Sequence, residues 1–290
     1  MRKNFQTFFC LILVTFFFAS LSMGAGKTIL ADALPYTITN EVIVDNEACT
    51  FKITKAEIDP IWGFSLKVFC ENKTSDKTLM FSITEAIVNG YMVDPFWAKE
   101  VAPGKKSNET ISFSSTDFKD IGITSANEII FTLRVYDSND WMAENVVNDS
   151  FTIYPTGLSA DAIQYPERKT SPTEQVIIDN DDICFVILGT EIDKIWGYTI
   201  NCFIENKTDK TLMFSWDDVS VNGYMIDPYW VEEVAPNARS YDEIHFLPDK
   251  FTENDISTVE EIEFSMRVYD SNDWMADNVY LETLTYKPVN

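Results

Sequence analysis

Histidine is nearly absent from this 290-residue chain, which contains only His245. A zinc site or a histidine-dependent nucleophile needs more than this single side chain. Paired carboxylates are abundant, but their number alone predicts no reaction. We therefore expect the protein not to be an enzyme. A hydrolase is the less favoured alternative, and it would need a polar cleft in which carboxylates of perturbed pKa converge.

Basic residues are scarce: the chain has 22 Lys and Arg against 46 Asp and Glu, for a formal net charge of −24. Such a surface repels nucleic acid and anionic lipid. The sequence therefore excludes nucleic acid as an expected partner. It favours solubility, and it suits cationic partners or metal ions.

Long apolar runs are missing except near the start, where Phe8–Met23 follows Arg2 and Lys3. This arrangement is typical of a secretory signal, and the A-x-A sequence Ala31-Asp32-Ala33 predicts cleavage after Ala33. We expect a secreted or cell-surface protein with no membrane insertion after cleavage. The alternative is an uncleaved N-terminal membrane anchor, for which the run is short.

The chain contains two copies of one module, offset by 134 residues before Ser75 and by 133 after it. The decapeptide Arg134–Ala143 recurs unchanged as Arg267–Ala276, and Val88–Met92 recurs as Val221–Met225. Between the copies lies a stretch rich in Pro, Ser, Thr and Gly without apolar periodicity, which is typical of a linker. The predicted organisation is a signal peptide (1–33), a first module (34–155), a linker (156–174) and a second module (175–290).

Each module shows the two-residue periodicity of strands, as in 129–135, where apolar side chains recur at every second position. Asn89-Gly90 and Asn222-Gly223 predict tight hairpins because both residue types tolerate positive φ. About 115 residues accommodate seven or eight short strands. The sequence predicts an all-β fold of two tandem antiparallel immunoglobulin-like β-sandwiches, with a small barrel as the alternative.

These motifs occur in a recognisable order. The first module has Glu71-Asn-Lys-Thr74, Val88-Asn-Gly90, Val101-Ala-Pro-Gly104 and Arg134-Val-Tyr-Asp137, and the second has Asn237 in place of Gly104. In this order the chain resembles immunoglobulin-like modules in secreted proteins of Gram-positive bacteria, which belong to families of unknown function. The resemblance implies a fold and a compartment. It implies no catalytic residues.

The cysteines of the mature chain fall two to a module, in an exported chain where oxidation is permitted. One disulfide is a candidate between Cys49 and Cys70, which share the inward parity of their strands. A second, between Cys184 and Cys202, would need a bulge because Cys184 has the opposite parity to Ile183. Free thiols are the alternative in both modules.

Aromatic side chains gather near two predicted turns of each module and suggest a ligand-binding patch. The candidates are Trp97, Tyr91 and Phe96 in the first module and Trp230, Tyr224 and Tyr229 in the second. The alternative is that each tryptophan closes one end of its own core.

Oxygen-bearing side chains cluster after one strand of each module and suggest a calcium site. The candidate ligands are Asp137, Asn139 and Asp140, and Asp270, Asn272 and Asp273. The set is not an EF-hand, and Asp and Asn are also ordinary turn residues.

The sequence thus predicts a secreted tandem β-sandwich that binds an extracellular protein or glycan, with two similar faces that could give avidity. Calcium is the only cofactor that it suggests. The main alternative is a structural spacer or assembly component of the cell envelope.

Overall fold

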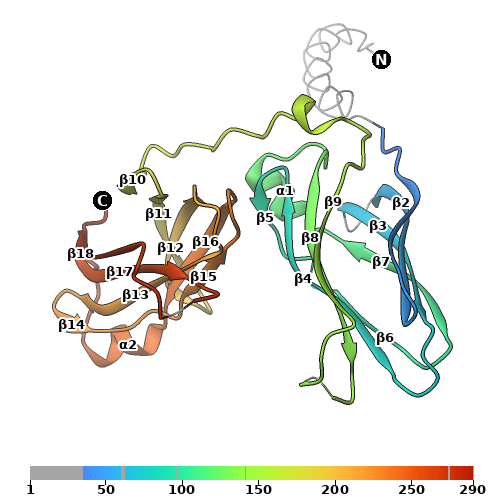
Figure 1. Cartoon of the computed structure of the whole chain (residues 1–290). Coiled ribbons are helices and arrows are strands. Elements are labelled where there is room, and N and C mark those ends of the chain that lie inside the picture. Colours follow the sequence, from blue (N-terminus) through green and yellow to red (C-terminus); the bar gives the residue numbers. More distant parts are fainter. Residues whose placement is uncertain (1–34, 60–62, 96, 141, 274, 290) are drawn as a thin grey trace, which may run out of the picture. The chain divides into compact units, whose positions relative to one another are not determined.

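The computed structural model describes residues 35–59, 63–95, 97–140, 142–273 and 275–289, except for the side chain of Asp117. Almost all of the regular structure consists of antiparallel strands (Figure 1). The prediction of an all-β fold is therefore confirmed. Tyr36–Asn290 is one compact unit.

Two predictions about the start of the chain lie outside the described residues. These are the signal peptide at 1–33 and its cleavage after Ala33. Within the part of the chain that the structure describes, no helix has the length and apolarity required to cross a membrane.

The first module has two antiparallel sheets. One has the strand order β1-β2-β3-β7, and the other is built on β4, which pairs with β5, β6 and β8, while β9 pairs with β8. Its elements are β1 (Thr39–Asp45), β2 (Cys49–Asp59), β3 (Gly63–Asn72), β4 (Leu79–Val88), β5 (Tyr91–Met92), β6 (Ala98–Val101), β7 (Lys106–Ser112), α1 (Ser115–Ile121), β8 (Ile129–Asp137) and β9 (Val147–Ile153).

The second module repeats this arrangement, with β10-β11-β12-β16 in one sheet and β14, β15, β17 and β18 around β13 in the other. A short 3-10 turn, Ala160–Ala162, lies in the connection between the modules, and one parallel bridge joins Tyr91 to Arg239. The elements of the second module are β10 (Gln175–Asp179), β11 (Ile183–Asp193), β12 (Gly197–Asn206), β13 (Leu212–Val221), β14 (Tyr224–Met225), β15 (Val231–Val234), β16 (Arg239–Phe246), α2 (Pro248–Glu253), β17 (Ile262–Asp270) and β18 (Tyr280–Tyr286).

Aromatic side chains join the two sheets of each module. The ring centroid of Phe51 on β2 lies 6.5 Å from those of both Phe81 and Phe131, which belong to the facing sheet. In the second module Phe185 on β11 lies 6.2 Å from Trp216 on β13. Burying each such side chain stabilises the fold by roughly 1.5–3 kcal/mol. Each module is therefore a β-sandwich with a core between its sheets, as the alternating pattern predicts.

Both Asn-Gly pairs form the predicted hairpins, which connect β4 to β5 and β13 to β14. Asn89 and Gly90 have φ of 50° and 81°, and Asn222 and Gly223 have φ of 51° and 84°. These values lie in the left-handed region, which Asn and Gly enter at low cost.

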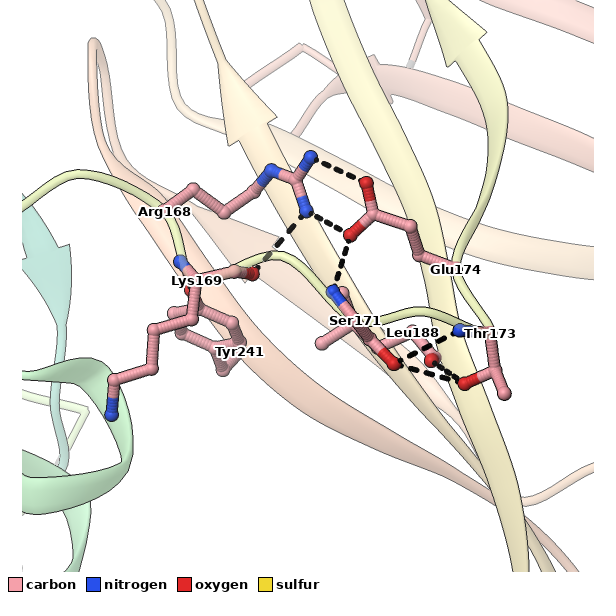
Figure 2. Close-up of polar contacts among 7 residues, drawn as sticks. All are labelled: Arg168, Lys169, Ser171, Thr173, Glu174, Leu188 and Tyr241. Carbon is pink, nitrogen blue, oxygen red and sulfur yellow. Dashed lines mark hydrogen bonds and ion pairs between the residues drawn. The ribbon is translucent and has the colours of Figure 1, made fainter.

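The predicted linker is ordered where it meets the second module (Figure 2). Arg168 donates two hydrogen bonds to the carboxylate of Glu174, at 2.8 and 3.0 Å. The backbone N–H of Ser171 donates to the same carboxylate at 2.9 Å, and Thr173 Oγ1 donates to the carbonyl of Leu188 on β11 at 2.8 Å. Arg168, followed by the Ser171 N–H, lowers the pKa of Glu174 to about 2. The predicted linker thus has specific hydrogen bonds, although its sequence shows no apolar periodicity.

The four described cysteines are buried free thiols, so neither predicted disulfide is formed. Cys70 is paired across β2 and β3 with Phe51, and Cys49 with Asn72, which makes the two thiols diagonal neighbours. Cys184 is paired with Glu205, three positions along β12 from Cys202. The predicted bridge between Cys184 and Cys202 is therefore wrong, because the register separates the two residues.

Candidate functional site

The tip of the β11–β12 hairpin presents apolar side chains to solvent. Oδ1 of Asp193 accepts hydrogen bonds from the backbone N–H groups of Ile195 and Trp196, both at 2.7 Å. This turn directs Ile195 outward, where 74% of its surface is exposed, and leaves Trp196 49% exposed. The hairpin tip therefore places an exposed tryptophan next to an exposed isoleucine.

His245 on β16 supports this tip. Its ring stacks on Trp196 with 5.4 Å between centroids and 26° between planes, and its Nδ1 lies 3.1 Å from the hydroxyl of Thr199. The carbonyl of His245 accepts a hydrogen bond of 2.9 Å from the N–H of Tyr229, whose side chain is 81% exposed. We call Ile195, Trp196, Tyr229 and His245 the aromatic face of the second module.

A pair of carboxyl groups lies beside the aromatic face, where β15 of one sheet meets β16 of the other. Glu232 on β15 accepts a hydrogen bond from the hydroxyl of Ser240 at 2.9 Å. Asp242 on β16 accepts one from the indole N–H of Trp230 at 2.7 Å. The two carboxyl groups are also hydrogen bonded to each other. We call Glu232 and Asp242 the carboxyl pair.

Burial, and next the neighbouring Asp242 carboxylate, raise the pKa of Glu232 to about 7. Burial also raises the pKa of Asp242. Two carboxylates in contact cannot both ionise without a large cost, so the pair retains one proton near neutral pH. Such a pair can donate or accept a proton, and it can respond to pH.

The first module has an ion pair at the same place. The offset of 133 matches Glu232 with Lys99 on β6 and Asp242 with Glu109 on β7. Nζ of Lys99 lies 2.7 Å from Oε1 of Glu109, which also accepts a hydrogen bond from Ser107. The pKa of Glu109 is consequently lowered, first by Lys99 and then by Ser107. The first module therefore has an ion pair of opposite charges, Lys99 with Glu109, between these strands. The second module has two carboxyl groups there, because glutamate replaces the lysine.

The structure divides the predicted aromatic patch instead of assembling it. Trp97 and Trp230 are half-buried, and each packs on the core of its own module. Their ring centroids lie 6.0 Å from those of Phe51 and Phe185 respectively. Tyr91 is fully buried and its hydroxyl donates to the carbonyl of Pro166, so its predicted exposure is wrong. Tyr224 and Tyr229 are exposed as predicted, and Phe96 lies outside the described residues.

The residues predicted to bind calcium form hydrogen-bonded turns. Oδ1 of Asp137 accepts from the N–H of Asn139 at 3.1 Å, and Oδ1 of Asp270 accepts from the N–H of Asn272 at 3.0 Å. Lys210 also pairs with Asp270 at 3.1 Å. The described residues contain no group of three or more His, Cys, Asp or Glu side chains able to hold a metal ion. Of the candidate ligands, Asp137, Asp270 and Asp273 use a carboxylate oxygen to accept backbone hydrogen bonds within these turns.

Sequence reasoning missed both Trp196 with its histidine support and the carboxyl pair. The signal for the carboxyl pair was available, because aligning the two copies matches Lys99 with Glu232. The contact between Trp196 and His245 had no such signal, since the first copy has Ser112 at the position of His245.

Neither a protein-family model nor a curated protein matches this chain. Among solved structures, the SafA pilin of Salmonella enterica in complex with the SafB chaperone is 12% identical, with a TM-score of 0.22 over 86% of this chain and 99% of that chain. Red sea bream transglutaminase is 11% identical, with a TM-score of 0.22 over 82% of this chain and 31% of that chain. A protein of unknown function from Porphyromonas gingivalis W83 is 10% identical, with a TM-score of 0.21 over 81% and 97%. At these TM-scores the likenesses carry no argument.

Proposed function

We propose that the protein is an exported binding protein that engages an extracellular protein or glycan through the aromatic face of the second module. The observation that carries this proposal is the solvent exposure of Trp196 and Tyr229 on either side of His245. Large amphipathic rings at an exposed site bury much surface on binding at a low entropic cost, and they stack on sugar rings or peptide side chains.

The location of the aromatic face also supports binding. Its residues come from a hairpin tip, the end of β16 and the segment just before β15, all held by the sandwich, and loops and strand ends are the usual position of ligand-binding groups on such folds. In the first module the position of Tyr229 is taken by Phe96 and that of His245 by Ser112. The proposal therefore places the principal site on one module. The two-sided avidity expected from the sequence is not required.

Screening the secreted chain against a glycan array and against extracellular proteins from the producing organism tests the proposal. Trp196→Ala and Tyr229→Ala should each weaken binding about tenfold or more, the cost expected of a central aromatic contact. Tyr224→Ala removes another exposed tyrosine, on β14, and should leave binding unchanged. Equal binding by Trp196→Ala and the unaltered chain would contradict the proposal and favour the structural spacer.

Export is part of the same proposal, and it has a separate test. Mass spectrometry of the chain recovered from the culture medium should show an N-terminus at Leu34. Recovery of the intact chain from membranes would instead show a retained anchor.

A further inference from the structure

The carboxyl pair joins the two sheets of the second module at a weakly held strand. β15 has four residues, and among the described strands it pairs only with β13. The pairs run from Leu212 with Val234 to Ser215 with Val231. On its other side β15 meets β16 through Glu232 and Asp242. Tyr229 of the aromatic face lies two residues before β15.

Neither carboxyl group has an ion pair with a lysine or arginine among the described residues. The largest causes of the pKa shifts of Glu232 and Asp242 include no lysine or arginine, and the only cationic group among them is His245, which acts on Asp242. In the first module Lys99 supplies that cation to Glu109 between β6 and β7. The second module thus has a second carboxyl group where the first module has an ammonium group.

Other titratable groups face the pair from the elements around it, and most of them add negative charge. They are Glu233 on β15, Glu243 and His245 on β16, and the thiol of Cys202 on β12, and the adjoining hollow is lined by Glu85, Asp94, Asp120 and Lys169. The residues of β13 that pair with β15 carry no titratable side chain. The surroundings therefore oppose ionisation of the second carboxyl group.

We propose that Glu232 and Asp242 share one proton that fastens β15 to β16, and that release of this proton to solvent loosens β15 and weakens the aromatic face. The effect on the aromatic face matters only if the proposed binding function is correct, and in this respect the inference rests on it. The loosening of β15 does not depend on that function.

The direction of the pH dependence follows from linkage. The pKa of Glu232 is raised in the folded protein, so its contribution to stability is complete below its ordinary value near 4.5 and is lost as the pH rises through about 7. The matched position between β6 and β7 of the first module lacks this dependence, because the pKa of Glu109 there is lowered. The second module should therefore loosen in a range where the first does not.

Hydrogen exchange of the full chain without ligand tests this directly. Protection factors, corrected for the intrinsic rate at each pH, are compared for the amides of 231–234 and for the matched strand 98–101. Between pH 5 and pH 7.5 protection of 231–234 should fall about tenfold or more, since one pKa unit corresponds to a factor of ten. Protection of 98–101 should stay constant.

Variants assign the effect to the pair. Glu232→Lys installs the residue of the first module and Glu232→Gln retains hydrogen bonding without charge, so both should abolish the fall in protection. Glu263→Gln removes an exposed carboxylate on β17 and should leave the fall in place. An unaltered chain whose 231–234 protection is independent of pH, or a fall that persists in both Glu232 variants, would overturn the inference. Because no ligand is used, a failure of the binding proposal would not affect this result.

Discussion

The cysteines show how burial controls the chemistry of a single residue. Burial, as the largest cause, raises the pKa of Cys49 to about 11 and that of Cys70 to about 12. The thiolate is the reactive form, so both side chains are held in the unreactive state at neutral pH.

This predicts a simple thiol titration of a chain that begins at Leu34. At pH 8 a thiol reagent should label the folded protein slowly, and after unfolding without reductant it should label four thiols. Fewer than four would reveal a disulfide, and Cys49 with Cys70 would be the first pair to examine because their strands are adjacent.

Repeated asparagines show what the two copies have kept in common. Nδ2 of Asn72 donates to the carbonyls of Lys77 and Val101, at 2.7 and 2.8 Å. In the second module Nδ2 of Asn206 donates to the carbonyl of Val234 at 2.9 Å, among others. Each amide satisfies buried backbone groups that would otherwise be costly. The copies therefore share their internal polar anchors and differ in the charges between β6 and β7 or between β15 and β16.

At the level of elements, the β11–β12 hairpin depends on Gly197, which directly follows Trp196. Gly197 has φ of +80°, and an added Cβ would clash with the carbonyl oxygen of Phe246 and lie 2.9 Å from Cδ of Pro248. Gly223 has a similar φ of +84°, but an added Cβ there would meet nothing within 4 Å. The two glycines separate the cost of backbone strain from the cost of a steric clash.

Gly223→Ala should therefore destabilise the protein by about 1 kcal/mol, the cost of positive φ alone. Gly197→Ala adds a clash with backbone atoms and should cost about 3 kcal/mol or more. Urea unfolding followed by circular dichroism measures both. Equal losses of stability would show that the close approach of β12 to Phe246 is unimportant.

The strands and hairpins could be predicted because they follow local rules. Alternation within 129–135 determines which face of β8 is buried, and the Asn-Gly pairs have a backbone preference of their own. The burial of Tyr91 could not be predicted, because a turn-like sequence does not reveal that its hydroxyl donates a hydrogen bond to the carbonyl of Pro166, 75 residues later. The carboxyl pair depends on how two sheets meet, which alternation within a strand does not encode, and only the alignment of the two copies, which matches Lys99 with Glu232, pointed to it.

For the molecule as a whole, the connection between the modules has a defined structure over residues 168–174. Its Arg168 and Glu174 are paired with two hydrogen bonds, and Thr173 is bonded to β11 (Figure 2). A bidentate pair with additional backbone contacts holds its geometry better than a simple surface ion pair. Through Thr173 this segment is therefore fixed to β11 of the second module.

Arg168→Ala should release this segment and increase its cleavage by a broad-specificity protease several-fold at neutral pH. The pKa of Glu174 is lowered to about 2 in the folded chain, so the contact is complete above the ordinary value near 4.5 and is lost as the pH falls towards 2. With pepsin, the ratio of cleavage rates between Arg168→Ala and the unaltered chain should therefore approach one at pH 2 and exceed one at pH 4. Lys250→Ala, which removes an exposed ion pair with Glu253 on α2, is the control and should cleave like the unaltered chain. A ratio of one at every pH would mean that Arg168 and Glu174 do not hold the segment in place.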